Sequence, residues 1–254
     1  MRHRVIRFLL ALSVSSALAA EKRPVNVAAA ANLKDAADAI AQAFQAEHPE
    51  VEVKLTIGAS GNFFAQIQNG APFDLFLSAD TEYPDKIVAA GLARAEDERV
   101  YAFGKLIAWL PAGSTLDLEK NGLAALRDSR VKHIAIANPA VAPFGRATVQ
   151  AFQAAGVYDA VKDKLVLGTS VAQTSQFATT GAADVAFLPY SLTFNKELSG
   201  GKVFFVPEKL YPRIEQSGVV LASSKEADLA RKLLAFITGE KGRDILTRFG
   251  YGLP

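Results

Sequence analysis

The apolar residues of this chain follow two alternating patterns. Short apolar runs, which are typical of strands, take turns with stretches in which apolar residues recur every three or four positions, as on one face of a helix. The first third of the chain gives three predicted strands and three predicted helices in alternation: 25–30, 32–49, 51–58, 62–70, 73–79 and 82–91. This βαβαβ order predicts an α/β fold with a mostly parallel sheet.

The same alternation occurs a second time, after an extended stretch at 100–112. The strands and helices predicted there are 133–139, 146–156, 164–168, 171–181 and 184–190. A second extended stretch follows at 202–224, and two helices fill most of 225–254. We therefore predict two α/β lobes joined by extended crossings near 103 and 207. Lobe I comprises 20–103 plus 208–254, so that the last helices return to it, and lobe II comprises 104–207.

The first nineteen residues differ from the rest of the chain. A basic start, "MRHRVIR", precedes the apolar run "FLLALSVSSALA", and Ala17-Leu18-Ala19 fits a small-residue cleavage site. The run is too short to cross a bilayer. Residues 1–19 are therefore predicted to be a secretory signal, with a mature chain that begins near Ala20. The alternative, a buried N-terminal helix, lacks a capping residue.

Charge and composition exclude several classes of protein. Removal of the signal takes away three of the 28 basic residues and no acid, so 25 remain against 26 acidic ones and the formal charge changes from +2 to −1. The basic pI of the precursor thus gives no support for nucleic-acid binding. The absence of cysteine excludes disulfides, thiol chemistry and thiolate metal sites.

Four predicted helices begin where a strand has just ended, two in each lobe. Asn32 opens the first and is predicted to cap it, Ser60 opens the second, Phe144 the third and Val171 the fourth. Ligands of α/β sheets bind at the carboxyl ends of the strands, where helix starts offer unpaired N–H groups. Four such starts brought together from two lobes would bind an anion. Each turn alone is better explained by ordinary helix capping, and only the gathering of all four would favour an anion site.

Five segments, in order along the chain, resemble the periplasmic molybdate-binding proteins of ABC importers. They are "VNVAAAANLKDAADAIAQAF", "GASGNFFAQIQNGAPFDLFLSAD", "NPAVAPFG", "TSVAQTSQ" and "FITGEKGRDILTRFGYG". The resemblance implies a two-lobed periplasmic binding protein fold of type II, with the ligand in the cleft between the lobes. It also implies that the protein binds molybdate or tungstate, without a cofactor and without catalysis, and delivers it to a membrane permease from the periplasm. A monomer is expected.

The resemblance also implies which residues contact the anion. A side chain at the first turn falls on Asn32, where many relatives have Ser or Thr, and a serine hydroxyl falls on Ser60. Backbone N–H groups fall on Phe144 and Val171. A tyrosine hydroxyl falls on Tyr190, although a one-residue shift is needed to align it. The same five residues are the only ligands expected for the molybdenum or tungsten oxyanion.

A site made of neutral donors suits molybdate, a dianion that accepts hydrogen bonds and carries no proton to donate at neutral pH. Phosphate keeps a proton and would need an acceptor such as aspartate, which none of the four turns contains. Sulfate would accept the same donors and differs only in size. A binding protein for another tetrahedral oxyanion, chiefly sulfate, is therefore the main alternative.

Other candidates fit less well. An enzyme on the same scaffold would need a nucleophile, a base or a cofactor lysine in the cleft, and the four turns supply none. The predicted signal and the lack of a DNA-binding segment argue against a regulatory ligand-binding domain. Arg146 could clamp the anion, but a solvent-facing position in the first helical turn is favoured. Asp74 and Asp80 are interpreted as caps at strand ends, and His48 and His133 belong to no metal-spaced motif.

Overall fold

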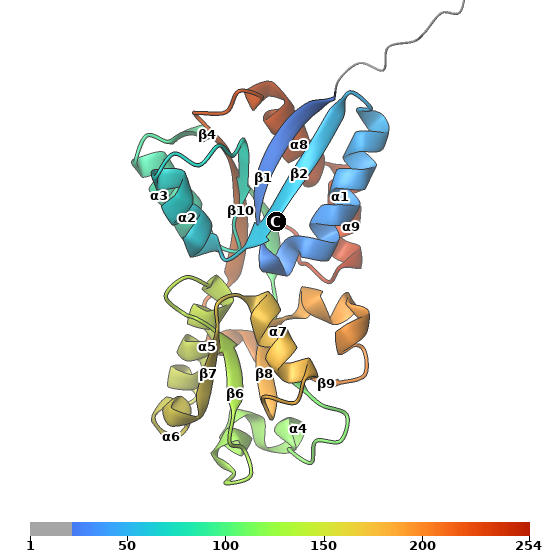
Figure 1. Ribbon diagram of the computed structural model, residues 1–254. Helices are drawn as coiled ribbons and strands as arrows, with labels where there is room; N and C mark the ends of the chain where they lie inside the picture. The colour runs from blue at the N-terminus through green and yellow to red at the C-terminus, as the bar shows by residue number, and fades with distance from the viewer. Residues whose placement is uncertain (1–21) are drawn as a thin grey trace, which may run out of the picture.

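The computed structural model describes residues 22–254, which form two sheets of five strands each, with helices on both sides (Figure 1). The strand order is β2-β1-β3-β10-β4 in the first sheet and β7-β6-β8-β5-β9 in the second. The predicted α/β class with two lobes is confirmed. The predicted signal at 1–19 lies outside the described residues. Within 22–254 no helix has the length and apolar character needed to cross a membrane.

The three central strands of the first sheet, β1, β3 and β10, are buried on both faces over most of their length, which explains their apolar runs, whereas the edge strands β2 and β4 are partly exposed. Its strands are β1 (Arg23–Ala30), β2 (Val51–Gly58), β3 (Leu75–Leu77), β4 (Ala93–Gly104) and β10 (Ile214–Leu221). Its helices are α1 (Lys34–Glu47), α2 (Ser60–Gln68), α3 (Glu82–Ala89), α8 (Ala227–Thr238) and α9 (Glu240–Arg248). Leu75 and Leu77 pack with α1, α8 and α9, whereas Phe76 between them packs with α2 and α3. The C-terminal helices thus lie against the first sheet.

The second sheet has its own core and its own helices. Its strands are β5 (Leu106–Leu110), β6 (Ile134–Ala137), β7 (Leu165–Gly168), β8 (Val185–Pro189) and β9 (Lys202–Phe205). Its α-helices are α4 (Leu118–Asn121), α5 (Pro143–Ala154), α6 (Tyr158–Val161) and α7 (Val171–Thr179). Short 3-10 turns complete the chain: η1 (Ala31–Leu33), η2 (Gly122–Arg127), η3 (Lys162–Lys164), η4 (Tyr190–Phe194), η5 (Lys196–Leu198) and η6 (Glu208–Leu210).

Both sheets are mixed, which refines the expectation of mostly parallel sheets. In each sheet two strand pairings are parallel and two are antiparallel. The antiparallel pairings all involve β10 or β5. The extended stretch predicted at 100–112 splits at Lys105 into the end of β4 and the whole of β5, so one run supplies a strand to each sheet. The stretch predicted at 202–224 likewise supplies two strands, β9 to the second sheet and then β10 to the first.

The two lobes pack against each other directly. The core of the second lobe includes Ala30, Ala31 and Ala79, which lie at the ends of first-lobe strands. Backbone groups also join the lobes, since the Gly61 N–H donates to the Val141 carbonyl at 2.9 Å. The structure is therefore that of the closed arrangement, in which strand ends of the first lobe pack against the second lobe (Figure 1).

Candidate functional site

A small cavity lies where the two lobes meet. Both lobes supply its walls, which come from the ends of strands and the starts of helices: Ala30, Ala31, Asn32, Gly58, Ala59, Ser60, Ala79, Ala142, Pro143, Phe144 and Val171. Its volume is about 10 Å³, close to what one water-sized sphere occupies and far below the several hundred Å³ of sites for large organic ligands. The cavity therefore suits a compact solute held at the carboxyl ends of the strands.

Four of the five residues expected from the sequence line this cavity. Asn32 and Ser60 come from the first lobe, and Phe144 and Val171 from the second. All four are at least nine-tenths buried. The four helix starts that the sequence leaves unconnected are thus brought together by the packing of the lobes.

Tyr190 is the exception, since it does not line the cavity. It begins η4, and its ring packs against Phe205 and Phe194 with centroid separations of 4.8 Å and 5.4 Å. The next residue, Ser191, points its hydroxyl towards the first lobe instead and donates to the Asn32 carbonyl at 2.9 Å. Tyr190 therefore packs within an aromatic cluster of the second lobe, and its place among the anion ligands stays a prediction.

Ser60 occupies the first position of α2 but does not cap it with its side chain. The residue at the cap position is Ala59, and the Ser60 Oγ accepts a hydrogen bond from the Ala79 N–H at 3.0 Å. Because a hydroxyl has one hydrogen of its own, this contact leaves the Ser60 hydrogen free to donate. The predicted capping role is therefore replaced by a link to the end of β3 that fixes the hydroxyl at the cavity wall.

Asn32 also differs from the predicted helix cap. It lies inside η1, and α1 begins after it, with no side-chain cap. Its Nδ2 instead donates to Gln216 Oε1 at 2.9 Å and to the Tyr251 hydroxyl at 3.0 Å. Burial raises the pKa of the Tyr251 phenol, so this hydroxyl keeps its proton at neutral pH. Asn32 is thus tied into a buried polar network instead of turning back onto its own helix.

The second-lobe turns present backbone donors. Pro143 occupies the first position of α5, which starts three residues earlier than predicted, as suits a proline at a helix start. The Ser170 hydroxyl caps α7 by accepting from the Gln173 N–H at 3.3 Å. The N–H groups of Phe144 and Val171 belong to the first turns of these helices, where no carbonyl of the helix can reach them. They are therefore available to a solute.

A cluster of charged side chains links the two lobes near the cavity, but none of them lines it. Arg146 of the second lobe forms an ion pair with Asp80 of the first, contacts Glu82 at 3.2 Å and donates to the Tyr83 hydroxyl at 3.2 Å. Burial raises the pKa of the Asp80 carboxyl, and the Ser78 hydrogen bond and the Arg146 charge offset this only in part. Arg146 therefore joins the lobes through an ion pair, in place of the solvent-facing position that the sequence favoured. Asp80 takes part in this link.

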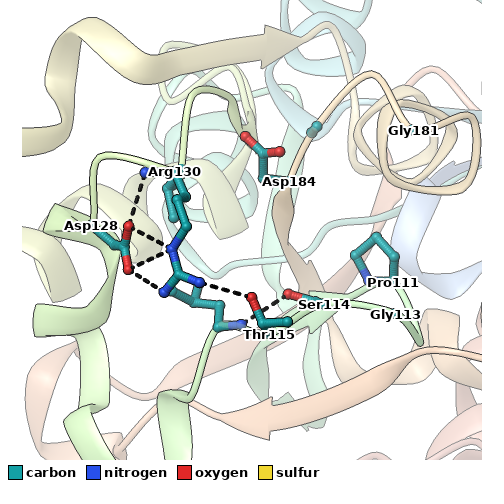
Figure 2. A pocket seen from close by; sticks show the side chains of 11 residues that line it. Pro111, Gly113, Ser114, Thr115, Asp128, Arg130, Gly181 and Asp184 are labelled. Atoms are coloured by element: carbon teal, nitrogen blue, oxygen red, sulfur yellow. Dashed lines mark hydrogen bonds and ion pairs between the residues drawn. The ribbon is translucent and has the colours of Figure 1, made fainter.

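A larger hollow of about 320 Å³ lies at the opposite end of the second lobe (Figure 2). Its walls include Val131 and Asp184, which precede β6 and β8, so it lies at the amino ends of these strands. Its one guanidinium, that of Arg130, is held by Asp128 and donates to Thr115 Oγ1 at 3.1 Å (Figure 2). A charge already neutralised in this way makes the hollow a poor anion site.

Sequence reasoning missed the residues behind the cavity. Gln216, Tyr251 and Ser191 all contact Asn32, although they lie 159 to 219 positions away along the chain. Tyr251 stands in the aromatic tail "FGYGLP" and Gln216 in an extended crossing, and neither carries a local motif. Only the pairing of distant segments reveals them. Among residues 22–254, no group of three or more His, Asp or Glu is placed to hold a metal ion.

Residues 25–252 match the family of bacterial extracellular solute-binding proteins. The chain belongs to this family. Among its relatives, the molybdate-binding protein ModA of Azotobacter vinelandii is 38% identical over 238 residues, which cover 93% of each protein. ModA of Rhodobacter capsulatus is 38% identical over 242 residues, covering 95% of this chain and 93% of that protein.

A solved structure of the family agrees with the fold. The periplasmic molybdate-binding protein of Azotobacter vinelandii matches with a TM-score of 0.83 and 32% identity, covering 91% of this chain and 99% of that one. The resemblance expected from five short segments is therefore confirmed over nearly the whole length of the described chain.

Proposed function

We propose that this protein is the solute-binding component of an ABC importer, and that it binds molybdate and tungstate in the periplasm and delivers them to a membrane permease. The observation that carries the proposal is the chemistry of the cavity. Its eleven lining residues include no acidic and no basic side chain. The polar groups that they offer are amides, N–H groups and one hydroxyl, which suit a fully ionised oxyanion.

The proposed ligands are the side chains of Asn32 and Ser60 and the backbone N–H groups of Phe144 and Val171. They come from both lobes, so an anion contacts all of them only when the lobes are closed. Such an anion stabilises the closed arrangement by its differential affinity for it. The names of the relatives from Azotobacter vinelandii and Rhodobacter capsulatus support molybdate as this anion.

We further propose that the protein acts by binding alone, as a monomer and without a cofactor. The one hydroxyl of the cavity, that of Ser60, contacts the Ala79 N–H, not a base that could activate it. The neutral walls argue in the same direction, since a site of this kind has no residue to transfer a proton.

A thermal-shift panel with molybdate, tungstate, sulfate and phosphate tests the proposal on the mature protein. Molybdate and tungstate are expected to raise the melting temperature strongly, and phosphate, which keeps a proton, is expected to do so least. Stabilisation by sulfate equal to that by molybdate would instead support a general binding protein for tetrahedral oxyanions. No stabilisation by any of the four anions would exclude the proposed class of ligand.

A further inference from the structure

A buried network of polar side chains lies directly behind the cavity. Asn32, Gln216 and Tyr251 are 3%, 0% and 5% exposed. The Asn32 Nδ2 donates to Gln216 Oε1 at 2.9 Å and to the Tyr251 hydroxyl at 3.0 Å, and the Tyr251 hydroxyl donates to the Asn32 carbonyl at 2.7 Å. Tyr101 contacts Gln216 Oε1 at 3.2 Å. Asn32 is the only member of this network that also lines the cavity.

Two atoms of the network lack a hydrogen-bond partner within the described chain. They are Asn32 Oδ1 and Gln216 Nε2. A buried polar group without a partner is costly, so this pair calls for a physical reason. Both partners of Asn32 Nδ2 lie outside the cavity wall, which leaves Oδ1 as the amide atom without a partner in a residue that lines the cavity. An oxygen lone pair in that place would repel an oxyanion.

A second arrangement of the same side chains removes this conflict. A half-turn of both amides exchanges their nitrogen and oxygen atoms in place. Gln216 Nε2 then donates to Asn32 Oδ1 across the same 2.9 Å contact and to the Tyr101 hydroxyl across the 3.2 Å contact. Tyr101 can accept it because its own hydrogen goes to the Ser78 carbonyl at 2.7 Å. The Tyr251 hydroxyl turns its one hydrogen from the Asn32 carbonyl, which keeps the Ser191 hydroxyl as a donor, to Asn32 Oδ1 across the 3.0 Å contact. Asn32 Nδ2 then carries its two hydrogens on the side away from Gln216 and Tyr251.

The backbone holds Gln216 in a prepared place. The pairing of β10 with β4 shifts register between Gln216 and Ser217, an irregularity that re-aims side chains. On the neighbouring strand, two residues beyond Ala102, which pairs with Gln216, a Cβ at Gly104 would lie 2.6 Å from Gln216 Nε2, so the glycine leaves room for this amide. These two features fix the Gln216 side chain against Asn32.

We propose that Gln216 is a positioning residue, which in the anion-bound protein donates to Asn32 Oδ1 and thereby turns the Asn32 amide so that its N–H groups face the oxyanion. The inference rests on the proposed function, since it concerns a residue behind the same cavity. It also gives Gln216 a part in selectivity, because the opposite orientation of Asn32 offers an acceptor and would suit a protonated anion.

The experiment is a calorimetric titration with molybdate of the wild-type mature protein and three variants. Gln216→Met keeps a similar volume without an amide, so it no longer orients the Asn32 side chain. Molybdate binding is expected to weaken by about tenfold, which corresponds to the loss of one hydrogen bond from Asn32 to the charged anion. Gln216→Glu accepts but cannot donate when ionised, so it holds the Asn32 N–H groups away from the cavity. Its loss is expected to exceed that of Gln216→Met at pH 8 and to shrink as the pH falls and the carboxyl regains a proton. Ser217→Ala, a buried neighbour whose hydroxyl contacts Glu98, is the matched control and is expected to stay within twofold.

An NMR measurement follows the amide itself. In protein labelled with ¹⁵N-asparagine, the side-chain signal that disappears in Asn32→Ser belongs to Asn32. This signal is expected to shift when molybdate saturates the wild type and to stay in place in Gln216→Glu. An unmoved signal in the molybdate-bound wild type, or full affinity in Gln216→Met, would overturn the role of Gln216 and leave molybdate binding intact. A wild type that binds no oxyanion at all would overturn the proposed function and this inference with it.

Discussion

Replacement of Ser60 by alanine separates two roles of one hydroxyl. Its oxygen accepts from the Ala79 N–H at 3.0 Å, and both residues are buried. Its hydrogen is the part proposed to reach the anion. The substitution removes both interactions together, but they affect different quantities. The contact with Ala79 exists with or without ligand and contributes to folding, whereas the donation to the anion contributes to affinity alone.

The expected magnitudes follow from this division. A hydrogen bond to a charged group is worth roughly 1.5–3 kcal/mol, so Ser60→Ala should weaken molybdate binding by about tenfold to a hundredfold. The Ala79 N–H, left buried without an acceptor, costs about 1–3 kcal/mol of the free energy of unfolding. For a protein of this size each kcal/mol lowers the melting temperature by about 2–4 °C.

Calorimetric titration with molybdate and thermal unfolding without ligand measure the two effects separately. Ser217→Ala serves as the control, because it removes another buried serine hydrogen bond in the first lobe without touching the cavity. The control should lose stability and keep its affinity. The reasoning is refuted if Ser60→Ala is destabilised like the control yet binds molybdate within twofold of the wild type, since Ser60 would then contribute to folding alone.

Three further predictions concern the closed arrangement and the lobe cores. Gly61→Ala should weaken molybdate binding by about tenfold, or about 1.4 kcal/mol, because the new Cβ would lie 2.8 Å from the backbone of Val141 in the opposite lobe. Small-angle scattering with saturating molybdate should show a more open protein. Unchanged compactness and affinity would contradict this prediction. Arg146→Met breaks the ion pair with Asp80, in which the Arg146 side chain is 27% exposed. Because a partly exposed pair is screened by salt, molybdate affinity should fall only about threefold, and by less at high salt. A loss of affinity that does not depend on salt would point to a direct role of Arg146 at the anion. Hydrogen bonds from Arg130 lower the pKa of Asp128 from 3.8 to about 2. Their contribution to stability is therefore complete above pH 4 and is lost as the pH falls towards 2. Asp128→Asn should show a shallower fall in melting temperature over this range, and a slope identical to that of the wild type would argue against a contribution of the Asp128–Arg130 pair.

The alternation of apolar patterns predicted most of the fold because each element is buried in a regular way. The predicted strand 133–139 contains β6, and the predicted helix 171–181 contains α7, each between clear turn residues. The direction of β5 and β10 could not be predicted in the same way. Their apolar runs are compatible with either direction, and only the path of the chain between the lobes makes their pairings antiparallel.

The candidate site could be predicted only as far as its turns are local. Ser170 caps α7 as its spacing with Gln173 indicates. Asn32 and Ser60 look like caps in sequence as well, but tertiary partners, Gln216 for one and Ala79 for the other, take their side chains instead. Tyr190 was assigned to the site by alignment, and that role stays a prediction, whereas no local pattern predicts the packing of its ring against Phe205. Hydrogen bonds between side chains and residues distant in the sequence could not be predicted from local patterns.

The wall of the cavity has a consequence for how fast an ion enters and leaves. Ser60, Phe144 and Val171 are 1%, 2% and 6% exposed, and the two lobes meet around them. An ion held there cannot escape, and another cannot enter, until the lobes separate. Lobe opening thus limits the rate of ligand exchange. At high molybdate concentration the observed rate of binding should therefore level off at the rate of lobe opening. Two variants with equal affinity can then differ widely in how long they keep their cargo.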